Sequence, residues 1–298
     1  MIPTPLEETN LLGRRLLLKR EDSHELGSFK WRGALPTLEE YQRKGAETVI
    51  TASTGNHGAA TAWAAERLGM RAIVFASEGA SRTKVEQIEG LGADVRLVGA
   101  DFDEAKDAAE RFAADAGILF VDGLEREQYE GYSAIGDEIL DQSVEAPAGV
   151  VVPVGNGALL GGIGMGICRR APEVERIGVV AKNAPCMALS WEVGEPVDCE
   201  ASATFADGLA VRVAIPMAVE ALGEFASRML QVSERDMARA VDAYAEEGIR
   251  AEGAAAAALA AVPQLDDLGA PLVLVVTGRN IDEELFRRAR EDPGSFPD

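Results

Sequence analysis

Short runs of β-branched and apolar residues alternate along this chain with longer stretches in which apolar residues recur every three or four positions. The first pattern predicts buried strands and the second predicts amphipathic helices. We expect strands at 48–52, 72–76, 95–98, 118–121, 150–154, 176–180 and 272–276. We expect helices at 57–68, 82–91, 103–116, 128–142, 160–170, 234–246 and 282–290. This alternation predicts an α/β fold with parallel sheets that carry helices on both faces.

Two serines stand where helix N-caps are expected. Ser81 precedes the helix at 82–91, and Ser233 precedes the helix at 234–246 with Asp236 three residues further on. Serine side chains satisfy the first free amides of a helix, so both positions support the predicted helix starts. The alanine run at 254–258 suits a further, closely packed helix.

Size and charge narrow the class of protein. The 298 residues, 47% of them hydrophobic, can fill one large α/β core or two lobes. Fifty acidic residues against 29 basic ones give a net charge of −21, which argues against nucleic acid or an anionic membrane as partner. The N-terminus lacks a basic-then-apolar signal, and the apolar runs are shorter than a membrane span. We therefore expect a soluble, cytoplasmic protein.

Cysteine and histidine are too few for several kinds of site. Cys168, Cys186 and Cys199 are odd in number and lack CxxC spacing, which argues against a zinc site or a disulfide framework and fits a reducing cytoplasm. His24 and His57 are the only histidines, and neither lies near a G-x-S-x-G elbow. Histidine-rich metal sites are excluded by count.

Lys30 is the foremost candidate for chemistry. It lies in the run Gly-Ser-Phe-Lys-Trp-Arg-Gly-Ala at 27–34, between small residues on both sides. A lysine held against a planar ligand loses solvation, so its pKa falls and its neutral amine can form a Schiff base with an aldehyde. Most lysines are solvated surface groups, so this run alone would carry little weight.

Two glycine-rich turns each follow a predicted strand and open a predicted helix. The run Ser-Thr-Gly-Asn-His-Gly at 53–58 presents backbone amides at a helix N-terminus, which attract an anion. An ordinary strand-to-helix turn is the alternative, and a lone His57 is better explained by packing or a hydrogen bond than by acid–base work. The run Gly-Asn-Gly-Ala-Leu at 155–159 predicts a phosphate site. Leu160 stands where a dinucleotide motif needs glycine, and the P-loop signature is absent.

Two further runs complete the set. The strand at 272–276 ends in Thr277-Gly278-Arg279-Asn280, and residues 204–208 read Thr-Phe-Ala-Asp-Gly. Each alone is better explained as a common strand end or turn. Together with the lysine run and the two glycine-rich turns, they resemble the fold-type II pyridoxal 5'-phosphate (PLP) enzymes, which include threonine and serine dehydratases, serine racemases and threonine synthases. The resemblance covers nearly the whole chain.

This resemblance implies an architecture. It implies two open parallel-sheet α/β domains of the tryptophan synthase β type, with PLP between them. Residues 1–46 and 124–298 would form a large cofactor-binding domain. Residues 47–123 would form a small, mobile domain with the loop for the substrate carboxylate. It also implies a homodimer. Since the chain ends soon after Thr277, we expect no appended regulatory domain.

The resemblance also assigns roles. Lys30 would bind the cofactor and then take the substrate α-proton, while Phe29 and Gly208 would lie toward the two faces of its ring. Thr277 would form a hydrogen bond with the pyridine nitrogen, and Asn56 would form one with the 3-hydroxyl oxygen of the cofactor ring. The phosphate is assigned to Gly155, Asn156, Gly157, Ala158 and Leu159, and the substrate carboxylate to Ser53, Thr54, Gly55, Asn56 and His57.

The type of reaction is predicted from positions at which this chain differs from particular branches of the family. Trp31 stands where threonine synthase relatives have an acidic residue, although Asn156 and Ala158 resemble that branch. Residues 180–186 hold no Asp or Glu where racemase relatives place carboxylates for a cation, so we predict no metal. Thr54 stands where racemase relatives use a serine as second acid/base, so it is a candidate catalytic residue. Glu252 matches an acidic residue near the pocket in relatives, or is a helix-start glutamate.

We therefore expect a PLP-dependent lyase of the threonine/serine ammonia-lyase type, which turns an amino-acid substrate into a 2-oxo acid and ammonium by α,β-elimination. A neutral hydroxyl at the pyridine nitrogen favours elimination or β-replacement over transamination. An amino-acid racemase or a threonine synthase-like β-replacement enzyme is the alternative on the same cofactor. A catalytically silent binding protein would not need an intact Lys30 and Asn56.

Overall fold

The computed structural model describes residues 2–200 and 202–298. The chain forms two compact units. The larger unit comprises Met1–Ser28 and Tyr132–Asp298, and the smaller unit comprises Phe29–Gly131.

The smaller unit is wider than the domain predicted at 47–123. It takes in α1 (Trp31–Arg43), which packs along α2 (Asn56–Leu68). It also takes in Gly131, where an added Cβ would collide with the backbone carbonyl of Arg32. Packing of α1 on α2 therefore sets this boundary, and the assignment of a cofactor domain and a mobile domain stays a prediction.

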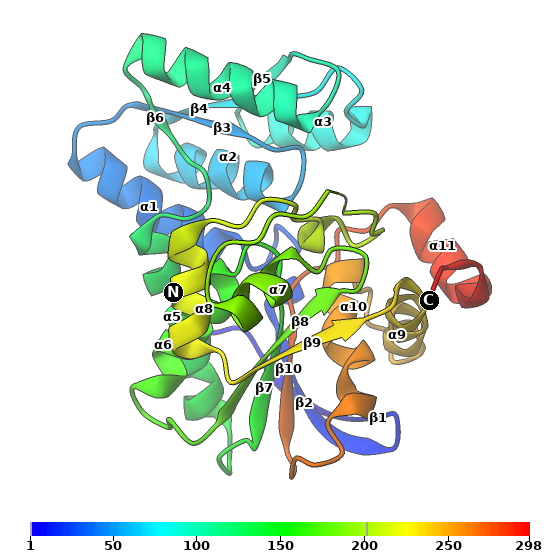
Figure 1. Ribbon diagram of the computed structural model, residues 1–298. Coiled ribbons are helices and arrows are strands. Elements are labelled where there is room, and N and C mark those ends of the chain that lie inside the picture. The colour runs from blue at the N-terminus through cyan, green and yellow to red at the C-terminus, as the bar shows by residue number, and fades with distance from the viewer. Residues whose placement is uncertain (1, 201) are drawn as a thin grey trace. The chain divides into compact units, whose positions relative to one another are not determined.

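A six-stranded sheet in the order β1-β2-β10-β7-β8-β9 forms the centre of the larger unit (Figure 1). Its strands are β1 (Leu6–Leu11), β2 (Arg14–Arg20), β7 (Gly149–Pro153), β8 (Glu175–Ala181), β9 (Arg228–Val232) and β10 (Leu272–Val276). β1 pairs with β2 in antiparallel fashion, and every other neighbouring pair is parallel. The loops after β7, β8 and β10 therefore gather at one edge of the sheet, where α/β proteins bind their ligands.

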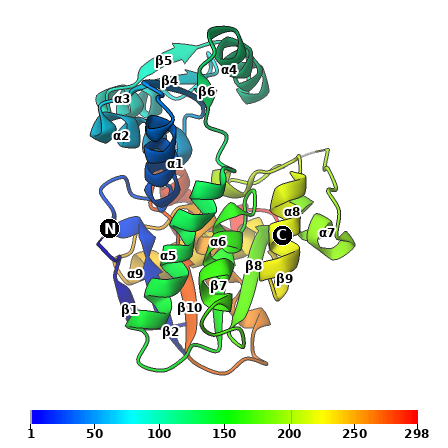
Figure 2. The ribbon, with the colours of Figure 1, turned by 90° about the vertical axis from the view of Figure 1, so that its left-hand side faces the viewer.

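Helices cover both faces of this sheet. On one face lie α10 (Gly253–Ala260) and α9 (Glu234–Glu246), and α11 (Glu283–Glu291) packs on α9 (Figure 1). On the other lie α5 (Arg126–Gln142), α6 (Ala158–Cys168) and α8 (Pro216–Phe225), and Figure 2 shows α5 and α6 across that face. α7 (Cys186–Val193) follows β8. Alanines 255–258 are fully buried in the core, because their small side chains let α10 lie close to β10 and β7.

The smaller unit is built on a four-stranded parallel sheet in the order β5-β4-β3-β6. Its strands are β3 (Thr48–Ala52), β4 (Arg71–Ala76), β5 (Asp94–Leu97) and β6 (Leu119–Phe120). α4 (Phe102–Ala116) packs Ala109 and Ala113 onto Ile50 and Phe75 of one sheet face. α2 covers the other face and contacts α3 (Arg82–Gly90) (Figure 1).

The predicted α/β fold is confirmed, and each predicted strand and helix is present. β3, β10 and α9 have the predicted limits. Ser233 caps α9 by accepting the backbone N–H of Asp236 at 3.1 Å, whereas Ser81 holds the N-cap position of α3 without a side-chain bond.

The sequence prediction missed β1, β2, β9, α1, α7 and α8. β1 and β2 carry charged residues in place of a β-branched run, and α1 contains both Gly33 and Pro36. In the part of the chain that the structure describes, no helix has both the length and the apolar character needed to cross a bilayer.

Candidate active site

The loop after β7 has the backbone shape of an anion site. Gly157 adopts a φ of 95° at the start of α6, a conformation open to glycine and costly for other residues. The first turn of α6 carries no acidic side chain, so its amides face no competing carboxylate within the helix. Asn156 accepts the N–H of Ala158 through its own side-chain oxygen at 3.2 Å, which holds the turn in place.

Gly155 brings this loop against the segment that carries Gly208. A Cβ on Gly155 would meet the carbonyl oxygen of Gly208, so the two backbones touch only because residue 155 is glycine. Gly208 lies in a short 3-10 turn, Asp207–Leu209, that also contacts α10. The structure thus brings together two of the motifs that the sequence singled out.

Thr277 follows β10, the strand next to β7, at the same edge of the sheet. The residue is only 2% exposed. Its hydroxyl oxygen has no hydrogen-bond partner among the described residues. Buried hydroxyls normally find a partner, so this oxygen is suited to meet a polar ligand atom.

Gly278 connects this strand end to the lysine run. It pairs with Ser28 in an isolated antiparallel bridge, and Ser28 stands two residues before Lys30. The hydroxyl of Ser28 is also buried without a partner in the described structure. Glu252 donates its backbone N–H to Gly278 at 3.0 Å, and a Cβ on Gly278 would lie 2.6 Å from the Glu252 carboxylate.

In the smaller unit, Lys30 is the N-cap residue that precedes α1, and it is half-buried. Its Nζ lies 5.1 Å from the centre of the Phe29 ring, within range of a cation–π contact. Lys30 also lies close enough to His57 for its positive charge to lower the pKa of the imidazole.

The loop at 53–58 joins β3 to α2. A Cβ on Gly58 would collide with the backbone carbonyl of Ser53, so this tight turn requires glycine. Ser53 accepts the N–H of Gly55 through its hydroxyl at 3.1 Å, and Asn56 begins the helix. No acidic residue lies in the first turn of α2, so the loop meets the requirement for an anion at a helix N-terminus.

His57 is held as a neutral ring. Its Nε2 lies 3.2 Å from the carbonyl oxygen of Val121, which also accepts the hydroxyl of Thr51 at 2.8 Å. Burial, with the nearby charge of Lys30, lowers the His57 pKa to about 4. The imidazole is therefore uncharged at neutral pH and donates Nε2–H to Val121.

Glu234 is a residue of this region that the sequence analysis missed. Its carboxylate holds the backbone of Phe205, three residues before Gly208. A glutamate at a helix start is so common that nothing in the local sequence distinguishes this one.

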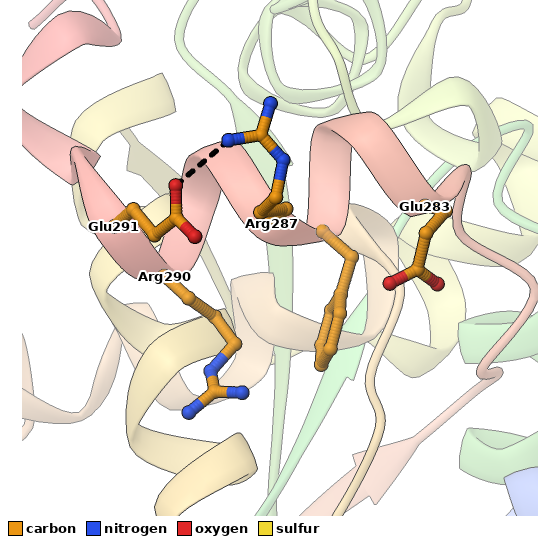
Figure 3. Close-up of a pocket in the computed structure, with 5 residues that line it drawn as sticks. Glu283, Arg287, Arg290 and Glu291 are labelled. Atoms are coloured by element: carbon orange, nitrogen blue, oxygen red, sulfur yellow. Dashed lines mark hydrogen bonds and ion pairs between the residues drawn. The ribbon is translucent and has the colours of Figure 1, made fainter.

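Residues of α11 line a shallow hollow of about 260 Å³, namely Glu283, Phe286, Arg287, Arg290 and Glu291 (Figure 3). Its charges pair locally, as in the 2.8 Å ion pair between Arg287 and Glu291. It contains none of the candidate residues. Among the described residues, no group of three or more His, Cys, Asp or Glu side chains is placed to hold a metal ion.

Comparison with known proteins identifies the family to which this chain belongs. A family model described as "pyridoxal-phosphate dependent enzyme" matches residues 1–278. The chain belongs to this family. The predicted fold type and the predicted cofactor, PLP, are thereby confirmed.

Several relatives are named as ammonia-lyases, dehydratases or deaminases. The L-threonine ammonia-lyase of Thermotoga maritima is 35% identical over 94% of this chain and 71% of its own length. The biosynthetic L-threonine dehydratase of Pasteurella multocida is 31% identical over 97% of this chain and 58% of its own length. The structure of processed threonine deaminase isoform 2 from Solanum lycopersicum superimposes with a TM-score of 0.91 at 30% identity, over 97% of this chain and 83% of that one.

The residues present fit the cofactor of this family. The buried Thr277 hydroxyl has no partner among the described residues and offers a polar contact for a ligand atom. Glycine at 155 permits the close approach to Gly208, and glycine at 157 permits the left-handed backbone that begins α6, so this strand-to-helix turn has the glycine-rich form that suits a phosphate.

Proposed function

We propose that this protein is a PLP-dependent ammonia-lyase that converts L-threonine or L-serine to a 2-oxo acid and ammonium. The observation that carries the proposal is the unpaired hydroxyl of Thr277, placed next to the Gly278–Ser28 bridge that leads into Lys30. The L-threonine ammonia-lyase from Thermotoga maritima and the threonine deaminase from tomato support this substrate class.

When bound, PLP supplies an electron sink that draws charge from the substrate Cα. A neutral threonine hydroxyl at the pyridine nitrogen keeps that sink weaker than a carboxylate would, which favours loss of the β-hydroxyl over transamination. The amides of residues 155–159 would bind the phosphate, with Phe29 and Gly208 toward the faces of the ring and Asn56 on its 3-hydroxyl oxygen.

Lys30 would hold the cofactor and then move the substrate α-proton as general base. The amides and hydroxyls at 53–57 would bind the substrate carboxylate at the start of α2. His57 does not compete with Lys30 for a proton, because its pKa of about 4 keeps it neutral at working pH.

A racemase or β-replacement enzyme is the second candidate, and the Thr54 hydroxyl in this loop is the residue that favours it. A racemase needs a second acid/base, and the β-branch of threonine restricts the rotamers that could serve. L-Serine and L-threonine should therefore yield 2-oxo acid and ammonium faster than inverted amino acid, by keto-acid assay and chiral chromatography. Thr54→Ala should leave that preference unchanged. Inverted amino acid as the main product would replace the lyase proposal with a racemase.

We further propose that the enzyme works in the cytoplasm as a homodimer. Three free cysteines suit a reducing compartment. The dimer rests on the family resemblance, and sedimentation of the purified protein tests it.

A further inference from the structure

Glu234 is a buried carboxylate at the first position of α9. Only 2% of the residue is exposed, and burial raises the pKa of its carboxyl group against the lowering effect of two hydrogen bonds. Burying a carboxylate costs free energy unless hydrogen bonds compensate. The partners of this side chain therefore indicate what it is for.

Both partners lie in one segment. Glu234 Oε2 accepts the hydroxyl of Thr204 and the backbone N–H of Phe205, each at 3.0 Å. The Thr204 hydroxyl in turn accepts the N–H of Ala206 at 3.0 Å. One carboxylate oxygen thus fixes three consecutive residues, which lead directly into the turn that holds Gly208.

The far end of this segment touches the predicted phosphate loop. The Gly208 carbonyl lies against Gly155. Behind it, the Phe205 ring lies so close to Gly253 that a Cβ there would come within 2.7 Å. A shift of the segment would therefore be passed to Gly155 through backbone contact.

Helix capping does not account for Glu234. Ser233 already caps α9 through the N–H of Asp236. The other carboxylate oxygen of Glu234, Oε1, is buried with no partner among the described residues, which is a cost that an apolar residue would avoid.

We propose that Glu234 is a positioning residue that fixes the segment 204–208 against the loop 155–159 and so sets how tightly the protein holds PLP. This inference rests on the proposed function. Glu234 touches neither reacting atoms nor, in this account, the cofactor itself.

The test compares Glu234→Ala with Glu234→Gln, which keeps an oxygen acceptor for Thr204 and Phe205. Glu246→Ala is the matched control, because Glu246 ends the same helix on its exposed side. PLP is titrated into each cofactor-free protein and followed by absorbance. Glu234→Ala should weaken PLP binding by about tenfold or more, Glu234→Gln by less than about threefold, and Glu246→Ala not at all.

Saturating PLP should restore the kcat of Glu234→Ala, because the chemistry itself is untouched. A purely structural role would instead lower the kcat and the thermal midpoint together. If Glu234→Ala fails to fold, Thr204→Val removes one of the two donors and should weaken PLP binding in the same direction. Wild-type protein that binds no PLP would overturn the proposed function. Wild-type protein that binds PLP no better than Glu234→Ala does would overturn this inference alone.

Discussion

Ser28 pairs with Gly278, so the segment leading into Lys30 is fastened to the end of β10. The backbone N–H of Arg279 reinforces the pairing by donating to the Gly27 carbonyl at 2.9 Å. Two motifs from opposite ends of the sequence are thereby joined at one edge of a sheet. Single substitutions at this junction and in the loops around it should therefore change PLP affinity and the free energy of unfolding by different amounts.

Thr277→Val should separate stability from cofactor binding. Valine has nearly the shape of threonine but lacks the buried, unpaired hydroxyl, so the free energy of unfolding of cofactor-free protein should rise by about 1 kcal/mol. The same change should weaken PLP binding, because the ring nitrogen would lose the partner that we propose for it. Denaturant unfolding and PLP titration measure the two effects, with Thr277→Ser as the control that keeps the hydroxyl. Valine at 277 with unaltered PLP affinity and turnover would show that this hydroxyl does not meet the cofactor.

Gly155→Ala should push the proposed phosphate loop, residues 155–159, away from Gly208. The new Cβ would collide with a backbone carbonyl, which cannot rotate aside as a flexible side chain can. PLP affinity should fall by at least about tenfold, a loss of roughly 1.4 kcal/mol. Gly223→Ala in α8 is the control, since a Cβ there would meet nothing within 4 Å and alanine suits a helix better than glycine. Equal PLP affinity in the two variants would rule out this loop as the phosphate site.

His57 should make the cofactor-free protein sensitive to acid. Its pKa is about 4 in the folded protein and 6.5 in the reference state, so the unfolded chain binds more protons between these values. The stabilisation by the neutral ring is complete above about pH 6.5 and is lost progressively as the pH falls from 6.5 to 4. Between pH 7.5 and pH 4.5 it amounts to about 2–3 kcal/mol of unfolding free energy.

His57→Gln should lack the pH-dependent part of the unfolding free energy that His57 supplies. Between pH 7.5 and pH 4.5 the unfolding free energy of this variant should therefore fall less than that of the wild type. Urea unfolding at the two pH values gives the comparison. Parallel losses in both proteins would mean that the ring is not held neutral.

The glycine-rich motifs could be read from the sequence because each is local. Gly157 needs its left-handed backbone within its own turn, and Gly58 is required by a residue only five positions away. In both cases a strand, a glycine turn and a helix start follow one another directly. Residue composition and hydrophobic periodicity are therefore sufficient to locate these two turns in the sequence.

Tertiary relationships could not be read in the same way. Glu234 looks like any helix-start glutamate until the fold brings Thr204 to it. The pairing of Ser28 with Gly278 likewise depends on β2 and β10 lying side by side. The edge strand β1 was missed because its exposed, charged residues resemble a surface loop. The packing of α1 on α2, which brings α1 into the compact unit Phe29–Gly131, likewise cannot be recognised from the local sequence.

The most direct test of the account is to trap PLP on Lys30. Borohydride reduction of the purified, PLP-loaded protein, followed by proteolysis and mass spectrometry, should place the cofactor on the peptide that contains Lys30. Lys44→Ala, which removes an exposed lysine just after the same helix, should give the same labelled peptide, whereas Lys30→Ala should give none. A label on another lysine, or a wild-type protein that takes up no PLP, would contradict the account.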